Sequence, residues 1–351
     1  MRLLSIRRTA TVAATGLLLL LAACGPNSEP DEAAGGSSQA AAATGFPVSL
    51  ENKFGTTTIA AEPKRIVTVG LVEQDALLAL GVVPVATTEW FGKKPGAVWP
   101  WAEAALGSAP KPQVLTNTDG VQFEKVAALR PDLILAVYSG LTAQDYATLS
   151  KIAPTVAQPK DQVDYGVSWQ DLTRTVGSAV GRKAQADKLV TDTEARFAAI
   201  REEHPEFVGA TGMMATTWEG YYVYGPQDPR GRLLTDLGFK LPDGLAEVTG
   251  KEFGANLSKE RTDLLDTGVL IWLVEKYAPD KAKVQSDPLY AKLKVKTEGR
   301  DIYLENEELV GAATSFISVL SLPLLLDKLV PQIAAAVDGN PATAVVRAPA
   351  S

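Results

Sequence analysis

The chain has 351 residues, of which 41 are acidic and 34 are basic, and its formal net charge is −7. This length can supply two ordinary α/β domains with buried cores, and the acidic balance argues against nucleic acid or an anionic membrane surface as a partner. The single cysteine excludes an internal disulfide, and the single histidine, His204, lies at a charged helix end, which argues against a His-based triad or zinc site.

The first predicted element is an N-terminal signal peptide over residues 1–23. Three arginines precede an apolar stretch that ends in Leu21-Ala22-Ala23-Cys24. Small residues before a cysteine resemble the cleavage box of bacterial lipoproteins, in which the new N-terminal cysteine receives a lipid. We therefore expect lipidation of Cys24; the alternative is an ordinary secretory signal with an incidental cysteine. The mature chain would carry 31 basic and 41 acidic residues.

Residues 24–45 are predicted to be a flexible tether, because their Pro, Ser, Gly, Ala and acidic residues cannot bury a core. A first α/β lobe is predicted over 46–167. It begins with an edge hairpin turning near Gly55 and continues as alternating strands and helices, which favours a mainly parallel sheet. The predicted strands are 65–69, 82–86, 133–137 and 155–157, and the predicted helices are 73–80, 124–129 and 146–152.

Residues 168–205 are predicted to link this lobe to a second one, because charged and apolar residues alternate there at helical spacing. Gly177 and Gly181 are expected to divide the segment into two helices, the second over 184–203. A second α/β lobe is predicted over 206–340, with a strand at 213–217 and a helix at 231–237. We expect its last apolar helix to start near Ser315 and end before Pro331, and the tail after Gly339 to be frayed.

Two distant units repeat one pattern. Glu124 and Glu260 each stand five positions before a leucine and nine positions before an apolar run typical of a buried strand. A Glu in the first turn of a helix is favoured by the helix dipole alone. Two at matched positions suggest two similar lobes and a shared outward-facing role.

Aromatic and cationic side chains gather where predicted strands end. In open α/β sheets, ligands bind outside the carboxyl ends of the strands. Trp and Tyr offer flat apolar area with a polar handle, and Arg offers a fixed cationic fork. The alternatives are packing under loops for the aromatics and solvation for the arginines. The candidate ligand-binding residues are Trp90, Tyr138, Trp218, Tyr222, Arg230 and Arg232.

The motifs of common enzyme classes are missing from the sequence. It contains no G-x-S-x-G elbow, no phosphate-binding loop and no G-x-G-x-x-G fingerprint. We therefore predict no catalytic residue, no metal ligand set and no cofactor.

Three segments, 65–81, 123–134 and 257–266, carry a resemblance to a known family. In this order, behind the lipoprotein box, the chain from Phe46 to Asp338 resembles the substrate-binding lipoproteins of iron-siderophore ABC importers, class III periplasmic binding proteins, most of all actinobacterial ones. The resemblance implies an α/β fold with two Rossmann-like lobes, mainly parallel sheets and one long linking helix. It also implies a binding protein rather than an enzyme.

The resemblance further implies that Glu124 and Glu260 meet arginines on the permease dimer of an ABC importer. The implied ligand is an Fe(III)-siderophore complex in the interlobe cleft, with a hydroxamate favoured over a catecholate. Some hydroxamate binders carry an arginine shortly before the first Glu, and residues 115–121 contain none. Cobalamin and haem binders share the fold and remain alternatives.

The location and partners follow from these expectations. We expect a monomer outside the cytoplasm, held to the cell membrane by the lipid on Cys24 and without a nucleic-acid partner. Two alternatives of other classes are a secreted lipoprotein hydrolase and a sensor or adhesion lipoprotein that binds a partner without transport.

Overall fold

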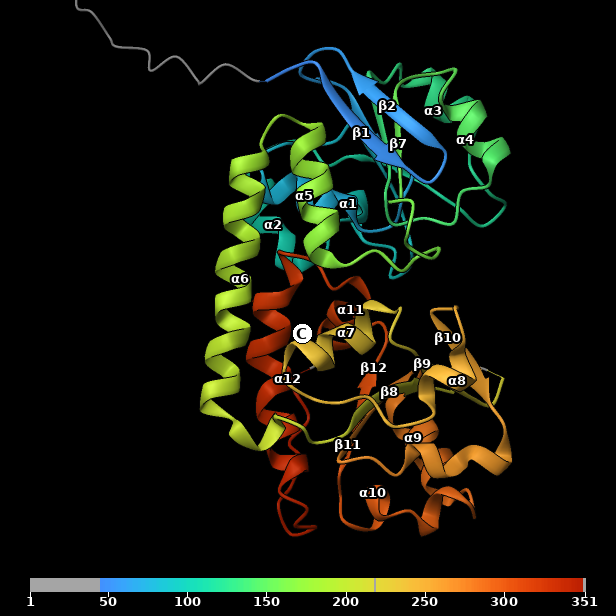
Figure 1. The fold of residues 1–351 in the computed structure, drawn as a ribbon, viewed down its shortest axis with the longest axis vertical. Helices are drawn as coiled ribbons and strands as arrows, with labels where there is room; N and C mark the ends of the chain where they lie inside the picture. Colours follow the sequence, from blue (N-terminus) through green and yellow to red (C-terminus); the bar gives the residue numbers. More distant parts are fainter. Residues whose placement is uncertain (1–44, 218, 350–351) are drawn as a thin grey trace, which may run out of the picture. The chain divides into compact units, whose positions relative to one another are not determined.

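The computed structural model describes residues 45–217 and 219–349, which belong to one compact unit, 43–351. The predicted signal peptide, most of the predicted tether, Cys24 and Trp218 lie outside the described residues. Within the unit, two five-stranded sheets lie in the N-terminal and C-terminal halves of the chain (Figure 1), in agreement with the expected two-lobe α/β fold.

The N-terminal half begins with the predicted hairpin. β1 (Val48–Asn52) pairs antiparallel with β2 (Gly55–Ile59). The sheet that follows has the order β5-β4-β3-β6-β7 and is parallel throughout. Its strands are short and, apart from the edge strand β5, fully buried, as expected for a sheet covered on both faces. They are β3 (Ile66–Thr68), β4 (Ala86–Thr88), β5 (Gln113–Leu115), β6 (Leu133–Ala136) and β7 (Thr155–Ala157).

The helices of this half are α1 (Glu73–Ala79), α2 (Pro100–Leu106), α3 (Phe123–Ala128) and α4 (Ala143–Leu149), with a 3₁₀ turn η1 (Pro95–Ala97). The sequence did not predict α2 or β5. The strand predicted at 82–86 starts only at residue 86, because Val82 belongs to the turn that ends α1 and its N–H donates to the Leu77 carbonyl at 2.9 Å.

Two helices lead from the first half to the second, as predicted. α5 (Trp169–Ala179) is followed by α6 (Lys183–Glu203), which runs alongside both halves (Figure 1) and measures about 32 Å at 1.5 Å per residue. The prediction that Gly177 breaks the helix is wrong. Gly177 lies inside α5, and a Cβ there would come within 2.3 Å of the Ala186 Cβ, so the glycine permits close packing of α5 on α6.

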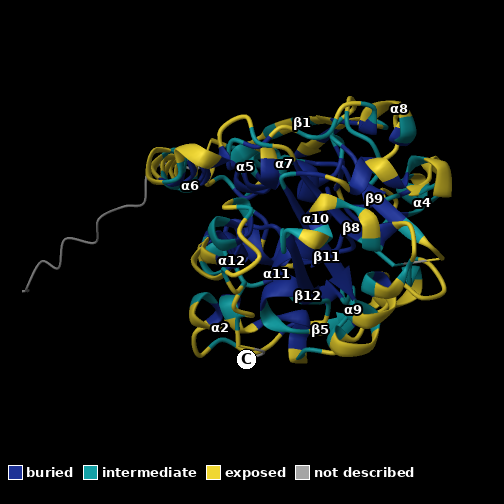
Figure 2. Ribbon diagram, turned by 90° about the horizontal axis from the view of Figure 1, so that it is seen from below, coloured by how far each residue is buried: buried dark blue, intermediate teal, exposed yellow. Residues whose placement is uncertain are grey.

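The C-terminal sheet has the order β10-β9-β8-β11-β12 and is mixed. β8, β11 and β12 are parallel, whereas β9 and β10 form an antiparallel edge that the sequence did not predict. Figure 2 shows β8, β9, β11 and β12 largely buried, while α6 presents an exposed outer face. The strands are β8 (Gly212–Thr216), β9 (Tyr221–Tyr224), β10 (Gly254–Leu257), β11 (Val269–Val274) and β12 (Asp301–Glu305).

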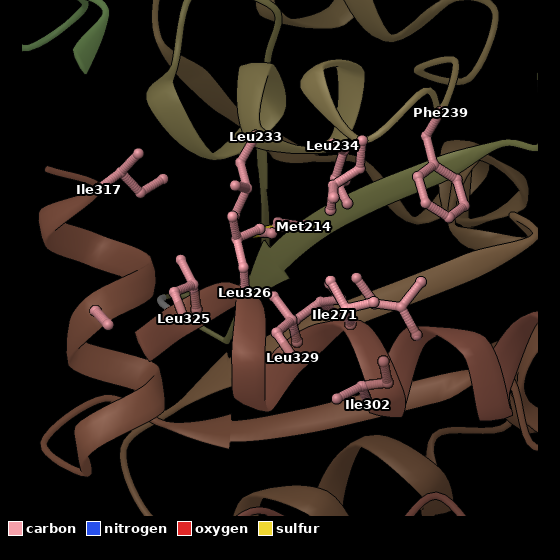
Figure 3. Close-up of a cluster of buried hydrophobic side chains, with 14 of the residues drawn as sticks. Met214, Leu233, Leu234, Phe239, Ile271, Ile302, Ile317, Leu325, Leu326 and Leu329 are labelled. Atoms are coloured by element: carbon pink, nitrogen blue, oxygen red, sulfur yellow. The ribbon is translucent and has the colours of Figure 1, made fainter. Parts of the chain in front are cut away.

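The helices of the C-terminal half cover both faces of its sheet. The α-helices are α7 (Pro229–Asp236), α8 (Leu245–Thr249), α9 (Tyr277–Ser286), α10 (Lys294–Thr297), α11 (Leu309–Phe316) and α12 (Ser321–Val337). On one face, α7 and α12 pack side chains such as Leu233 and Leu326 against Met214 of β8 and Ile271 of β11 (Figure 3). The 3₁₀ helices are η2 (Pro205–Phe207), η3 (Lys259–Leu265) and η4 (Tyr290–Lys292).

The end of the chain differs from the prediction in three ways. α12 begins at Ser321 and not near Ser315, which lies in the separate helix α11. α12 continues through Pro331, because apolar residues on both sides of the proline pack in the core and the Gln332 side chain donates to the Lys328 carbonyl at 2.9 Å. The described part of the tail, residues 340–349, contacts the rest of the protein and is not frayed. Val345 and Ala348 pack on the core, and the Arg347 guanidinium lies 3.8 Å from the centre of the Tyr277 ring.

The repeated unit is confirmed. Strands β6 and β11 begin nine positions after Glu124 and Glu260, although the second helix, η3, is 3₁₀ rather than α. The two halves share a further feature. Gly81 and Gly238 have φ of 71° and 102° and follow the last turns of α1 and α7. Only glycine takes these angles without strain, and each ends its helix in the same way.

Candidate ligand-binding cleft

A cavity of about 510 Å³ lies between residues of the two halves. Its N-terminal wall follows the carboxyl ends of β3, β4, β5 and β6, where ligands of parallel sheets bind. That wall is Leu71, Glu89, Trp90, Thr116, Asn117, Thr118, Tyr138 and Tyr165. The C-terminal wall is Thr216, Tyr222, Tyr224, Arg230 and Phe253.

The structure brings four of the six candidate ligand-binding residues to this cavity: Trp90, Tyr138, Tyr222 and Arg230. Arg232 does not line it. The Arg232 guanidinium donates to the carbonyl of Gly166 and, at 3.5 Å, to the Gln162 side chain, so it joins the two halves of the chain instead.

Arg230 is held as an ion pair at the start of α7. Asp228 caps the helix, and its carboxylate accepts from the Arg230 backbone N–H at 2.7 Å, from Nε at 2.8 Å and from Nη2 at 3.1 Å. The guanidinium carbon also lies 3.9 Å from the centre of the Tyr224 ring. Arg230 is 7% exposed and Asp228 is 1% exposed. The positive charge in the cleft is therefore already neutralised by a buried carboxylate.

Three aromatic rings form part of the N-terminal wall. The Trp90 ring centre lies 6.0 Å from that of Tyr138 and 5.4 Å from that of Phe316, and Tyr165 follows at 5.8 Å from Tyr138. Burial raises the pKa of Tyr138, and it raises the pKa of Tyr222 to about 12. Both phenols are therefore protonated at pH 7, so neither adds negative charge to the cleft.

A buried carboxylate, which the sequence did not single out, holds the backbone of Tyr138. Glu73 in the first turn of α1 is fully buried and accepts from the Tyr138 N–H at 2.7 Å and from the Val72 N–H at 3.1 Å. Burial raises the pKa of Glu73 to about 7, against the opposing effect of these hydrogen bonds.

Strand β9 divides its side chains between the cleft and the core. Tyr222 and Tyr224 line the cavity, while Tyr221 and Val223 pack with Trp272 on the other face of the sheet. Tyr224 was not among the predicted residues, although the alternation within Tyr221–Tyr224 could have indicated it. Tyr165 was also missed; it lies in a long connection and has a φ of 58°, uncommon for a residue with a side chain.

Glu124 and Glu260 are exposed, on α3 of the N-terminal half and η3 of the C-terminal half. His204 ends α6, where its Nδ1 lies 2.8 Å from a Glu206 oxygen. In the part of the chain that the structure describes, no three His, Cys, Asp or Glu side chains gather as a metal site would require. Over the same residues, no helix has the length and apolarity to cross a membrane.

Residues 66–307 match a family model described as a periplasmic binding protein. The chain belongs to this family. A periplasmic binding protein of this kind is an extracytoplasmic substrate-binding protein and not an enzyme, so a hydrolase is excluded.

Individual relatives agree with this assignment. The chain is 26% identical to the ferric enterobactin-binding periplasmic protein FepB of Escherichia coli over 303 residues. The match covers 82% of the present chain and 91% of FepB. A periplasmic solute binding protein of Mycobacterium smegmatis is 35% identical, with a TM-score of 0.73 over 83% of this chain and 98% of that one. Streptococcus pneumoniae PiaA, in complex with ferrichrome, is 28% identical, with a TM-score of 0.74 over 84% and 99%.

Proposed function

We propose that the protein captures a ferric siderophore in the cleft between its two halves and delivers it to the permease of an ABC importer. The observation that carries the proposal is the cavity of about 510 Å³, which has aromatic walls from both halves and a size typical of small-molecule sites. Relatives that bind ferric enterobactin or ferrichrome support it. We assign ligand contacts to Trp90, Tyr138, Tyr222 and Arg230, and none to Arg232.

The charges of the cleft favour a hydroxamate over a catecholate. Among the residues described as lining the cavity, the charged ones are Glu89 and Arg230, and Arg230 is paired with Asp228. A ferric tris-catecholate is a trianion and would need several unpaired cations to replace its hydration. A ferric trihydroxamate is neutral, so it suits neutral hydroxyls and flat aromatic faces.

Tryptophan fluorescence titration tests the ligand class. Ferrichrome, a neutral ferric trihydroxamate, is expected to quench the protein more strongly than ferric enterobactin or iron-free ferrichrome does. Trp90→Phe should remove most of the signal, because Trp90 lines the cavity. Trp169→Phe is the control, because Trp169 is buried in α5 outside the cavity. No response to any ferric chelate would refute the proposal.

Haem and cobalamin are the alternatives within the same fold. Haem iron takes a protein ligand such as His, Cys, Met or Tyr, and tyrosine is the one such type among the described lining residues. Titration with haemin and cobalamin alongside ferrichrome separates the three ligands. Tight binding of haemin or cobalamin, without binding of ferrichrome, would identify that compound as the ligand in place of a ferric siderophore.

For delivery, we propose that Glu124 and Glu260 form ion pairs with arginines of the permease dimer. Their exposure and matched positions in the repeated unit support this role. Glu124→Lys and Glu260→Lys should abolish uptake of ⁵⁵Fe-ferrichrome by the source bacterium and leave the Kd for ferrichrome unchanged. Glu103→Lys, a charge reversal at an exposed site on α2, is the matched control. An equal loss of ligand affinity would instead place these carboxylates in ligand binding.

We further propose that the protein is a monomer tethered to the outer face of the membrane by a lipid on Cys24. The lipoprotein-like box before Cys24 supports this anchor. Expression of the full chain with metabolic labelling by a palmitate analogue should label the wild type and not Cys24→Ser. Labelling that persists in Cys24→Ser would refute the anchor.

A further inference from the structure

Behind the cleft, two consecutive residues of the C-terminal half belong to different cores. Phe316, the last residue of α11, packs in the N-terminal core, whereas Ile317 packs in the C-terminal core (Figure 3). The ring of Phe316 lies with its centre 5.4 to 5.6 Å from those of Trp90, Phe91, Trp99 and Trp101. The boundary between the two cores therefore falls between Phe316 and Ile317, so this segment, like α6, connects the two halves.

The backbone at this crossing has an unusual and well-fixed conformation. Ile317 has φ of 27° and ψ of 72°, angles that a β-branched residue rarely adopts. The next residue is held by a pair of bonds: the Ser318 N–H donates to Ser321 Oγ at 2.8 Å, and the Ser321 N–H donates to Ser318 Oγ at 3.1 Å. The hydroxyl of Ser318 is thus fixed in place and directed out of the turn that precedes α12.

That hydroxyl meets a buried carboxylate of the other half. Ser318 and Asp75 are each 1% exposed, and the Ser318 hydroxyl donates to Oδ2 of Asp75 in α1. The same oxygen accepts from the indole N–H of Trp101 at 2.8 Å, and Trp101 belongs to α2 of the N-terminal half. A buried carboxylate needs such donors to offset its desolvation. One of its two bonds therefore lies within the N-terminal half, and the other crosses to the C-terminal half.

We propose that the Ser318–Asp75 bond is an interlobe tie that fixes the angle between the two walls of the cleft. The Phe316 ring beside the tie contacts Trp90, so a rotation at this point moves a residue of the cavity wall. Asp75 and Ser318 are then positioning residues for ligand retention. This consequence for the ligand rests on the proposed function, whereas the effect on the lobe angle does not.

The two donors of Asp75 provide a matched pair of variants. Ser318→Ala removes the donor that crosses between the halves. Trp101→Phe removes the donor within the N-terminal half and keeps an aromatic ring to pack against Phe316 of the other half. Asp75→Asn keeps the size of the side chain and one acceptor oxygen. It serves as the second variant if Ser318→Ala does not fold.

The lobe angle is measured without ligand by electron–electron double resonance. The full chain carries Cys24→Ser and spin labels at Lys125→Cys and Lys259→Cys, exposed positions on α3 and η3. Wild type and Trp101→Phe should give the same narrow distance distribution. Ser318→Ala, and to a lesser degree Asp75→Asn, should broaden or shift it. An unchanged distribution in Ser318→Ala, or an equal change in Trp101→Phe, overturns the tie.

Ferrichrome dissociation then tests the consequence for the ligand. Because the Ser318 bond crosses between the halves, its loss should speed dissociation about tenfold in Ser318→Ala. The loss of the Trp101 bond, which lies within one half, should speed dissociation by less than about twofold in Trp101→Phe. If wild type binds no ferrichrome while the distance distribution still broadens in Ser318→Ala, the proposed function fails and the tie stands. If ferrichrome binds normally and the distribution does not change, the tie fails and the proposed function stands.

Discussion

Asp228→Asn is expected to weaken the fold and to change which ferric chelates the cleft accepts. In the wild type, Asp228 accepts from Nε of Arg230 at 2.8 Å and from Nη2 at 3.1 Å, so the guanidinium is neutralised before any ligand arrives. Asparagine keeps one acceptor oxygen and loses the charge. A hydrogen bond to a charged group contributes about 1.5–3 kcal/mol, so the free energy of unfolding should fall by about 2 kcal/mol.

The freed guanidinium is expected to attract an anionic chelate. A pair of unit charges about 4 Å apart gains roughly 4 kcal/mol at an effective dielectric constant of about 20. Desolvation offsets much of this gain. We therefore expect the Kd for ferric enterobactin to fall about tenfold, which corresponds to about 1.4 kcal/mol, while the Kd for neutral ferrichrome changes by less than about twofold.

The assay is a fluorescence titration of wild type and variant with both chelates at low ionic strength, together with urea unfolding. Asp236→Asn is the matched control, because Asp236 lies in the same helix, undergoes the same change of charge and bonds to Trp169 away from the cavity. An unchanged ratio of the two affinities in Asp228→Asn would refute the conclusion that Asp228 sets the charge preference.

Three further predictions concern two buried carboxyl groups, the cavity wall and the packing of α5. Burial raises the pKa of Glu73 from 4.5 to about 7 and of Asp75 from 3.8 to about 6, so their contribution to the free energy of unfolding is complete below about pH 4 and is lost as the pH rises to 7. Urea unfolding of Asp75→Asn should show a flatter pH dependence than wild type between pH 4 and 6, and equal slopes would contradict this. Trp90→Ala should weaken ferrichrome binding by about 2 kcal/mol, about thirtyfold, in calorimetry, and Trp90→Phe by much less. Gly177→Ala should lower the free energy of unfolding by about 1–3 kcal/mol, because the added methyl meets α6, whereas the neighbouring Ser178→Ala should change it little.

Much of the fold could be predicted because the parallel strands are short apolar runs that follow helices at regular spacing. The β9–β10 edge could not, since the run Tyr221–Tyr224 reads equally well as aromatic packing under a loop. Its partner strand lies thirty residues away, and their pairing becomes visible only once the chain is folded. The prediction that the last helix ends before Pro331 failed for a related reason. Burial of residues on both sides of Pro331 outweighs the cost of a proline within a helix.

The cleft was predictable to the extent that its residues directly follow strands. Trp90 and Tyr138 come just after β4 and β6, so the position of the strands places them. Arg230 and Arg232 could not be distinguished without the register of α7. Two residues along a helix correspond to a rotation of roughly 200°, which turns the two guanidiniums to opposite sides. Tyr165 depends on the course of a long connection, for which no local pattern exists.

The alternation along β9 separates two kinds of position that adjoin in the sequence. Tyr221 and Val223 pack in the core on one face of the sheet, whereas Tyr222 and Tyr224 line the cavity and pack in the core on the other face. Substitutions at 222 and 224 can therefore alter the shape and polarity of the cleft while the packing beneath the strand stays intact. Ligand preference can thus change at alternate positions of one strand, with Tyr221 and Val223 kept, although each such change also has to preserve the packing of Tyr222 and Tyr224 in the core.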